Sequence, residues 1–162
     1  MTDASAGNSG ILMVAPYLRC QNAAAAIDFY KRAFGATEVF RLAEPSGRVG
    51  HAELKFGQAM IMVSDEYPEH NIFSPLAFGG VGSSVHLQVA NVDEVVASAV
   101  AAGAKVSMPA TDQFYGMRHA KVVDPYGHEW SLGQSIEKVS NEEVQRRYDD
   151  LLSQKSTPTT QN

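Results

Sequence analysis

The sequence predicts an α+β fold in which two β-α-β-β-β units form one cupped, eight-stranded mixed sheet, with the helices outside and a further helix at the C-terminus. Three observations predict it. A helical pattern ends at a glycine twice, at Gly35 and at Gly103, and alanine and then a strand pattern follow each glycine. One strand pattern precedes each helix and three follow it. Polar and apolar residues alternate along several strands, which is typical of a sheet covered on one face.

The first unit is predicted over residues 11–66. Asn22 is the expected N-cap of its helix, and Gly35 is the expected C-terminal stop. The pair Gly57-Gln58 suits a tight hairpin turn between the last two strands of the unit. The expected elements are a strand over 11–20, a helix over 23–34, and strands over 37–42, 49–56 and 59–64.

A linker rich in proline, glycine and polar residues is predicted over 67–82, and the second unit over 83–135. The segment Asp124-Pro125-Tyr126-Gly127 fits a type I turn before the last strand, because proline and glycine stand at its second and fourth positions. The expected elements are a strand over 84–90, a helix over 92–102, and strands over 105–108, 119–123 and 128–132.

The chain ends are predicted from local signals. Ser140 and Glu143 form a capping box, which indicates a C-terminal helix in the segment 136–153. Residues 1–10 and 154–162 are polar and rich in small side chains, so they are expected to be disordered.

Composition limits the partners. The chain has 162 residues, a formal net charge of -5 and a pI near 5.5, which argues against nucleic acid as a partner. Its apolar runs fall short of the roughly 20 residues that span a bilayer, and residues 1–10 do not resemble a signal peptide. The single cysteine, Cys20, is expected to be a buried, unreactive thiol. These features predict a cytoplasmic protein that binds neither nucleic acid nor membrane.

The alternation also predicts which residues line the cup. In the strand over 84–90 the apolar residues occupy odd positions and would pack on the helix, so Ser84, His86 and Gln88 would point into the cup. Such a polar concave face is typical of a small-molecule site, and the alternative is an open sheet whose polar residues face solvent. The arginines of the lining would meet an anionic group, and its tyrosines and methionines would cover an apolar part. The predicted lining consists of Tyr17, Arg19, His51, Glu53, Met60, Met62, Ser84, His86, Gln88, Tyr115, Arg118 and His119.

Three segments resemble the vicinal oxygen chelate superfamily, the group of glyoxalases, extradiol dioxygenases and bleomycin-resistance proteins. They are APYLRCQNAAAAIDFYKRAFGA, AGAKV and DPYGHEWSL. The stretch from Asp112 to Arg147 resembles the PhnB-like branch in particular. The resemblance implies the duplicated fold and a homodimer, in which the cups are often completed by paired or exchanged units.

Metal enzymes of this superfamily hold a divalent cation with His and Glu side chains from the first and last strands of each unit. The matching positions here fall on Ala15, Met62, Ser84 and Ser131, and none of these is a good ligand for such an ion. The resemblance therefore implies neither a metal nor another cofactor. The alternative is a divalent metal in a non-standard site that uses the cup histidines and Glu53.

Three functions remain open at this point. The first is a metal-free, small-molecule-binding cup of the resistance-protein kind, and the missing metal ligands favour it. The second is a metal-dependent glyoxalase-like lyase or ring-cleaving dioxygenase with a non-standard metal site. The third is an interaction protein without a ligand. The superfamily hosts several chemistries on one scaffold, so no catalytic residue is assigned.

Overall fold

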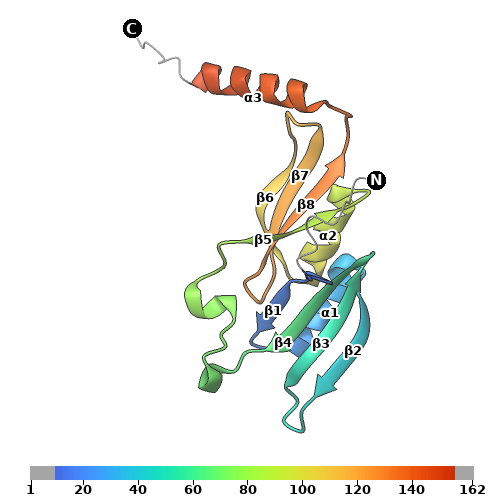
Figure 1. Ribbon diagram of the computed structural model, residues 1–162, viewed down its shortest axis with the longest axis vertical. Coiled ribbons are helices and arrows are strands. Elements are labelled where there is room, and N and C mark those ends of the chain that lie inside the picture. The colour runs from blue at the N-terminus through green and yellow to red at the C-terminus, as the bar shows by residue number, and fades with distance from the viewer. Residues whose placement is uncertain (1–9, 156–162) are drawn as a thin grey trace, which may run out of the picture.

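The computed structural model describes residues 10–155 and shows two β-α-β-β-β units followed by a C-terminal helix, which confirms the predicted fold class (Figure 1). The first unit consists of β1 (Tyr17–Cys20), α1 (Ala23–Phe34), β2 (Thr37–Ala43), β3 (Val49–Phe56) and β4 (Ala59–Asp65). The second consists of β5 (Ser84–Gln88), α2 (Val92–Ala102), β6 (Lys105–Asp112), β7 (Met117–Val123) and β8 (Glu129–Ser135). Between the units lie two short 3-10 helices, η1 (Pro68–His70) and η2 (Pro75–Phe78), and α3 (Asn141–Lys155) ends the described chain.

The eight strands form two four-stranded mixed sheets, and each sheet belongs to one unit. Their strand orders are β1-β4-β3-β2 and β5-β8-β7-β6. The first and last strands of each unit pair in parallel, and the other pairs are antiparallel. β1 and β5 are therefore edge strands of their sheets.

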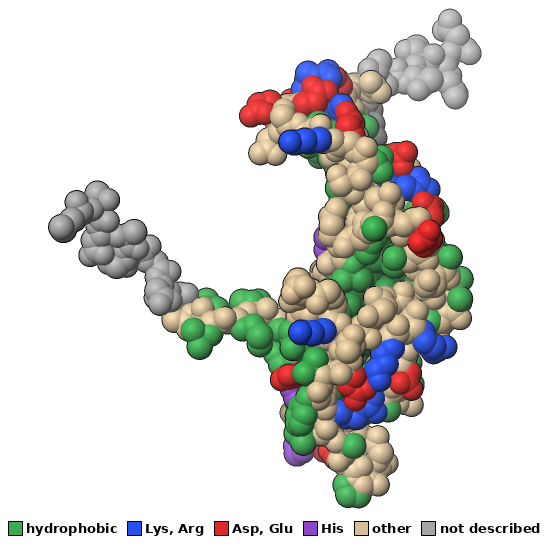
Figure 2. Space-filling view, turned by 90° about the vertical axis from the view of Figure 1, so that its right-hand side faces the viewer, with side chains coloured by type: hydrophobic (Ala, Val, Ile, Leu, Met, Phe, Trp, Pro, Cys, Tyr) green, Lys and Arg blue, Asp and Glu red, His purple; other side chains and the backbone are tan. Residues whose placement is uncertain are grey.

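One helix covers each sheet, and α1 and α2 also contact one another (Figure 1). The core lies between the helices and the sheets, and its largest fully buried side chains include Trp130, Tyr30, Phe29, Ile27 and Leu54. The opposite face of each sheet carries no helix. Figure 2 shows the resulting curved molecule, in which α3 and the first described residues border a hollow side.

α1 and α2 have the predicted bounds, because their caps are local. The Asn22 side chain accepts a 3.0 Å hydrogen bond from the Ala25 amide, and Gly35 ends α1 in the left-handed conformation with φ 67°. The Asn91 side chain caps α2 in the same way, and Gly103 ends that helix. The two units thus repeat the same helix signals 68 residues apart, since 103 − 35 = 68.

The first strand is shorter than predicted. Residues 11–16 are not part of a strand, and the pairing begins where the Met62 amide donates a 2.9 Å hydrogen bond to the Pro16 carbonyl. Proline has no amide to extend the ladder. The four apolar residues before it, Ile11, Leu12, Met13 and Val14, are exposed, and Leu12 is 98% exposed. We call residues 11–14 the apolar arm.

Other boundaries also differ from the prediction. β6, β7 and β8 each extend beyond the predicted strands, and β6 tolerates Pro109 because it is an edge strand. The predicted linker contains η1 and η2. Ser140 caps α3 as predicted, with its hydroxyl 3.2 Å from the Glu143 amide, but α3 includes residues 154–155, which were assigned to the disordered tail. Apart from Gly10, the rest of the expected disordered ends lies outside the described residues.

None of the helices within residues 10–155 combines the length and the apolar character needed to cross a membrane.

Candidate functional site

The two units place equivalent residues on their helix-free faces. In the first sheet Tyr17 lies opposite Met62, which lies opposite Glu53 on its other side. In the second sheet His86, Ser131 and Lys121 hold the same three places. Tyr17 therefore corresponds to His86, and Met62 corresponds to Ser131. By the same register His51, two residues before Glu53, corresponds to His119, two residues before Lys121.

In the second unit, four side chains form one hydrogen-bonded chain, which we call the polar chain. Tyr115 Oη lies 3.0 Å from His119 Nδ1, and His119 Nε2 lies 2.8 Å from Ser131 Oγ. Ser131 Oγ also lies 2.9 Å from His86 Nδ1. Because the Ser131 hydroxyl has one proton, it can donate to only one of the two imidazoles and must accept from the other.

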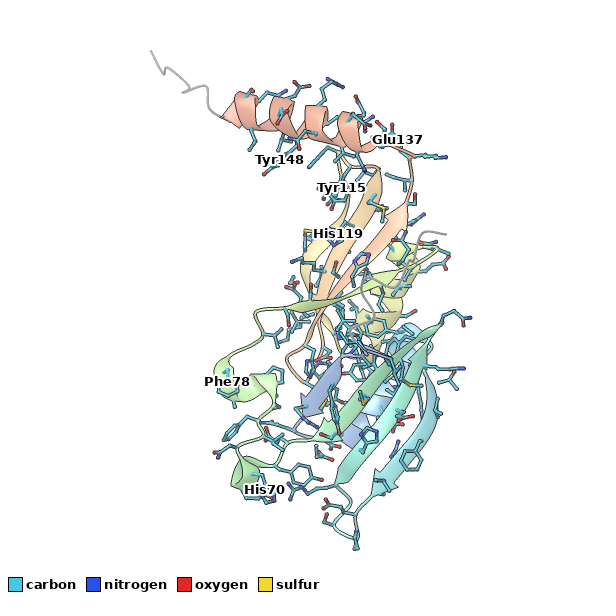
Figure 3. All side chains as sticks on the ribbon, in the orientation of Figure 1. His70, Phe78, Tyr115, His119, Glu137 and Tyr148 are labelled. Atoms are coloured by element: carbon cyan, nitrogen blue, oxygen red, sulfur yellow. The ribbon has the colours of Figure 1, made fainter. Side chains whose placement is uncertain are left out.

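A cavity of about 260 Å³ adjoins the polar chain. A Cβ atom on Gly133 would lie 2.8 Å from Cε1 of His86 and 2.9 Å from Cε of Met117, so the glycine leaves room for both side chains. Figure 3 shows Tyr115 and His119 on the second unit, on the side toward α3. The lining consists of His86, Tyr115, Met117, His119, Ser131 and Gly133.

Burial sets the protonation states in the polar chain. Desolvation lowers the pKa of His119 below its usual value, and the nearby His86 and Lys121 lower it further because they disfavour a second positive charge. Desolvation raises the pKa of Tyr115. At neutral pH His119 is therefore a neutral imidazole and Tyr115 a protonated phenol. Lys121 itself is paired with Glu129 at 3.0 Å.

The equivalent place in the first unit holds a charged group of side chains. Tyr17 Oη lies 2.8 Å from His51 Nδ1, and His51 Nε2 lies 3.5 Å from Glu53. The guanidinium of Arg19 lies over the Tyr17 ring, 3.6 Å from its centroid, and donates a hydrogen bond to Ser64 Oγ. This second group therefore differs from the polar chain, since it combines aromatic, cationic and anionic side chains.

A groove of about 1110 Å³ runs along the edge strands β1 and β5. Its walls come from the apolar arm, β1, β4, β5 and the turn between β3 and β4, together with Phe34 of α1 and Phe56 of β3. His86 lines both this groove and the cavity, so the two spaces meet at that side chain. The groove also contains the predicted residues Tyr17, Met60, Ser84 and Gln88.

The predicted site residues thus fall into distinct places. His86, Tyr115 and His119 converge on the cavity, whereas Arg19, His51 and Glu53 gather on the first sheet. Met62 lies on that sheet beside Tyr17.

Arg118 requires a correction. β7 begins at Met117, so Arg118 alternates with His119 and shares the helix-covered face with the buried Ala120. Its guanidinium donates to Asp93 of α2 at 2.7 and 2.8 Å and to Asp112 at 2.8 Å. Arg118 therefore fastens the start of α2 and is not a clamp at the rim of the cup.

Sequence reasoning missed Met117, Gly133 and the role of Ser131. The alternation along β8 directs Ser131 away from the face of the buried Trp130 and Leu132, but the predicted lining does not include Ser131. Its contact with two histidines depends on the register of β5, β8 and β7, and no sequence pattern gives that register.

The resemblance assigns the divalent metal to positions whose side chains here are poor ligands for it. The four matching positions carry a methyl group, a thioether and two hydroxyls, from Ala15, Met62, Ser84 and Ser131. Within residues 10–155, no group of three or more His, Cys, Asp or Glu side chains lies close enough together to hold a metal ion.

The fold and this site define a class of protein. The family model of the glyoxalase/bleomycin resistance protein/dioxygenase superfamily matches residues 10–132, and the chain belongs to this family. An uncharacterised protein of Mycobacterium bovis is 38% identical over 135 residues, which cover 82% of this chain and 89% of that protein.

Two solved structures have a similar fold. TioX from Micromonospora sp. ML1 is 27% identical with a TM-score of 0.59, and the match covers 79% of this chain and 99% of that one. A PhnB protein from Bacillus cereus is 20% identical with a TM-score of 0.58, and its match covers 75% of this chain and 98% of that one. The second likeness concerns the fold alone.

Proposed function

We propose that the protein binds a small molecule in the cavity beside the polar chain and uses no metal to do so. The observation that carries the proposal is the convergence of His86, Ser131, His119 and Tyr115 by hydrogen bonds on one wall of a cavity of about 260 Å³. Few but well-placed polar groups in a concave site are typical of small-molecule recognition.

The lining selects the chemistry of the ligand. The cavity walls carry no Asp, Glu, Lys or Arg, so an uncharged ligand group fits there best. The two ends of the polar chain, His86 Nε2 and Tyr115 Oη, can donate or accept according to the direction of the chain's protons. Met117 gives an adaptable apolar wall. A ligand larger than the cavity extends past His86 into the groove, which has about 1110 Å³ of room.

A thermal-shift screen tests this proposal, because a ligand that binds only the folded state raises the unfolding midpoint. Uncharged aromatic and carbonyl compounds form the library, with divalent metals, glutathione thioethers and glycopeptide antibiotics as further arms. For a hit, His86→Ala should weaken binding by about 1 kcal/mol or more, the scale of one lost hydrogen bond. His70→Ala, at an exposed site in η1, is the control and should bind like the parent protein.

Two results would overturn the proposal. One is a hit whose affinity is the same in His86→Ala, with the fold intact. The other is one tightly held divalent metal per chain in the purified protein, which would favour the metal-dependent lyase or dioxygenase instead.

We also propose that the protein is a homodimer whose second copy covers the helix-free faces. The apolar arm supports this, since Leu12 is 98% and Val14 is 87% exposed, and so do Phe40 and Leu42, which are exposed beside His51 and Glu53 on the first sheet. A set of exposed apolar residues of this kind is typical of an interaction surface.

Light scattering tests the dimer. The parent protein should have twice the mass of one chain. The double variant Leu12→Lys, Val14→Lys should have a lower mass, closer to that of the monomer. Val100→Lys, at an exposed position on α2, is the control and should leave the mass unchanged. A parent chain that is monomeric over the whole concentration range would refute the dimer.

A further inference from the structure

Ser131 occupies a position that ligand binding alone does not explain. Its hydroxyl lies between two imidazoles, 2.8 Å from His119 Nε2 and 2.9 Å from His86 Nδ1. The residue is buried, yet it lines the cavity. A buried serine hydroxyl that reaches both an empty space and a neutral imidazole is arranged as a nucleophile beside its base.

We propose that Ser131 is a nucleophile that accepts the acyl group of small, uncharged carboxylic esters, with His119 as its general base. The proposal rests on the ligand site proposed above, because the ester must enter the same cavity. It adds a covalent reaction to binding and needs no metal or redox cofactor.

The geometry supplies the three parts of such a site. The nucleophile-to-base distance of 2.8 Å lies within hydrogen-bond reach, and His119 Nδ1 is held by Tyr115 Oη at 3.0 Å. Tyr115 is thus a positioning residue, since it fixes the ring of His119 so that Nε2 points at Ser131. His86 approaches the same hydroxyl from β5, and an Nδ1–H there can donate to the ester carbonyl oxygen, which becomes the oxyanion when Ser131 attacks.

The reaction is balanced within the site. Ser131 Oγ attacks the carbonyl carbon and forms a C–O bond, while its proton passes to His119 Nε2. The tetrahedral intermediate then breaks the bond to the alcohol oxygen, and His119 returns the proton to the departing alcohol. Water repeats the sequence on the acyl-serine, which releases the carboxylic acid and restores the Ser131 hydroxyl.

The surroundings select the class of ester. The cavity of about 260 Å³ admits a small acyl group, and its uncharged walls favour a neutral one. Since His86 also lines the groove, the alcohol portion has a path out along β5. His119 is neutral at neutral pH because burial, His86 and Lys121 lower its pKa, so it can accept a proton there.

The test uses p-nitrophenyl acetate and the full-length protein. Peptide mass spectrometry after a short reaction at neutral pH should find the acetyl group on the peptide that contains Ser131. Ser131→Ala should abolish that adduct, and His119→Gln should slow acetylation about a hundredfold or more, as expected for the loss of a general base. Ser107→Ala, at an exposed position on β6, should react like the parent protein.

The pH profile adds a readout that a purely structural effect would not move. In the parent protein the acetylation rate should rise with pH to a plateau, with the midpoint of the rise below pH 6.5, because the pKa of His119 lies below that value. Tyr115→Phe should slow the reaction and shift the midpoint of this rise, since it removes the group that holds His119 Nδ1.

Each outcome decides between the claims. An adduct confined to other residues refutes Ser131 as the nucleophile, and an adduct on Ser131 that forms as fast in His119→Gln refutes His119 as its general base. If no adduct forms but a neutral ligand binds and His86→Ala weakens it, the inference falls while the proposed ligand site stands. If neither occurs, both are wrong.

Discussion

Tyr30, in the helix of the first unit, donates a 2.9 Å hydrogen bond to the buried carboxylate of Asp124, in the last turn of the second unit. Asp124 also accepts bonds from Trp130 Nε1 and from the amides of Tyr126 and His128, all at 2.9 Å. The Trp130 ring packs against Phe34 of the first unit, with centroids 4.6 Å apart. Asp124 and Trp130 of the segment DPYGHEW therefore join the two units, and both serve the fold.

Removing the hydrogen bond between Tyr30 and Asp124 should destabilise the whole protein. Tyr30→Phe is expected to lower the free energy of unfolding by about 1.5–3 kcal/mol, because the lost hydrogen bond is to a buried charged group. Urea denaturation measures the change. Tyr148→Phe, at an exposed tyrosine of α3, is the matched control and should change stability by less than about 0.5 kcal/mol. Equal effects of the two changes would contradict the role of Asp124.

α1 and α2 could be predicted to the residue because their signals are local. Asn22 and Gly35 act within one turn of α1, and no distant contact is needed to recognise them. The strand ends could not be predicted in this way, because a strand extends only as far as its pairing with a neighbouring strand continues. β7 begins two residues before the predicted position, which places Arg118 inside the strand, on the face opposite to that of His119.

The site was predictable only in part. Alternation correctly placed His86 and His119 on helix-free faces, since their neighbours Leu87 and Ala120 pack in the core. It could not show that both imidazoles reach one hydroxyl, because that depends on pairing between β5, β8 and β7. It also could not show that the eight strands form two sheets instead of one.

Gly133 should be essential for the shape of the cavity. In Gly133→Ala the new methyl group would meet His86 at 2.8 Å and Met117 at 2.9 Å, so these two side chains, which line the cavity, must shift. We expect a stability loss of about 1–3 kcal/mol from overpacking and weaker binding of any ligand that needs His86. Calorimetric titration and urea denaturation measure the two effects.

Gly82→Ala provides the comparison, since a Cβ at Gly82 meets no atom within 4 Å and its φ is not left-handed. It should bind ligand as the parent protein does. Unchanged binding in Gly133→Ala as well would show that the ligand does not use this cavity.

Stability should depend on pH through His119. Its pKa in the folded protein lies below the ordinary 6.5, so between these two values the unfolded chain binds more protons than the folded one. The free energy of unfolding therefore rises with pH across that window, and this contribution is lost as pH falls through 6.5 toward the folded pKa. Urea midpoints at about pH 5.5 and 7.5 should differ less in His119→Gln than in the parent protein. A difference of the same size in both proteins would show that other groups cause the pH dependence.

Gly116 should anchor the segment that leads to α3 beside Tyr115 of the polar chain. It follows Tyr115 directly, and its carbonyl accepts hydrogen bonds from the amides of Ile136 and Glu137 at 3.0 and 3.1 Å. Its φ is 79°, and a Cβ there would lie 2.6 Å from the Glu137 carbonyl oxygen. The change Gly116→Ala thus has two costs, a left-handed alanine and a backbone clash at the segment that leads to α3.

Gly47→Ala separates these two costs. Gly47 also has a left-handed φ, 89°, but a Cβ there meets nothing within 4 Å, so only the conformational cost of about 1–2 kcal/mol applies. We expect Gly116→Ala to lose about 1–3 kcal/mol more than Gly47→Ala, because overpacking against backbone is added. Hydrogen exchange should also show faster opening of α3 in Gly116→Ala alone, since the clash lies at the segment that holds this helix to the second sheet. If the two variants lose the same stability and α3 exchanges alike in both, the contact between Gly116 and Glu137 does not anchor the helix.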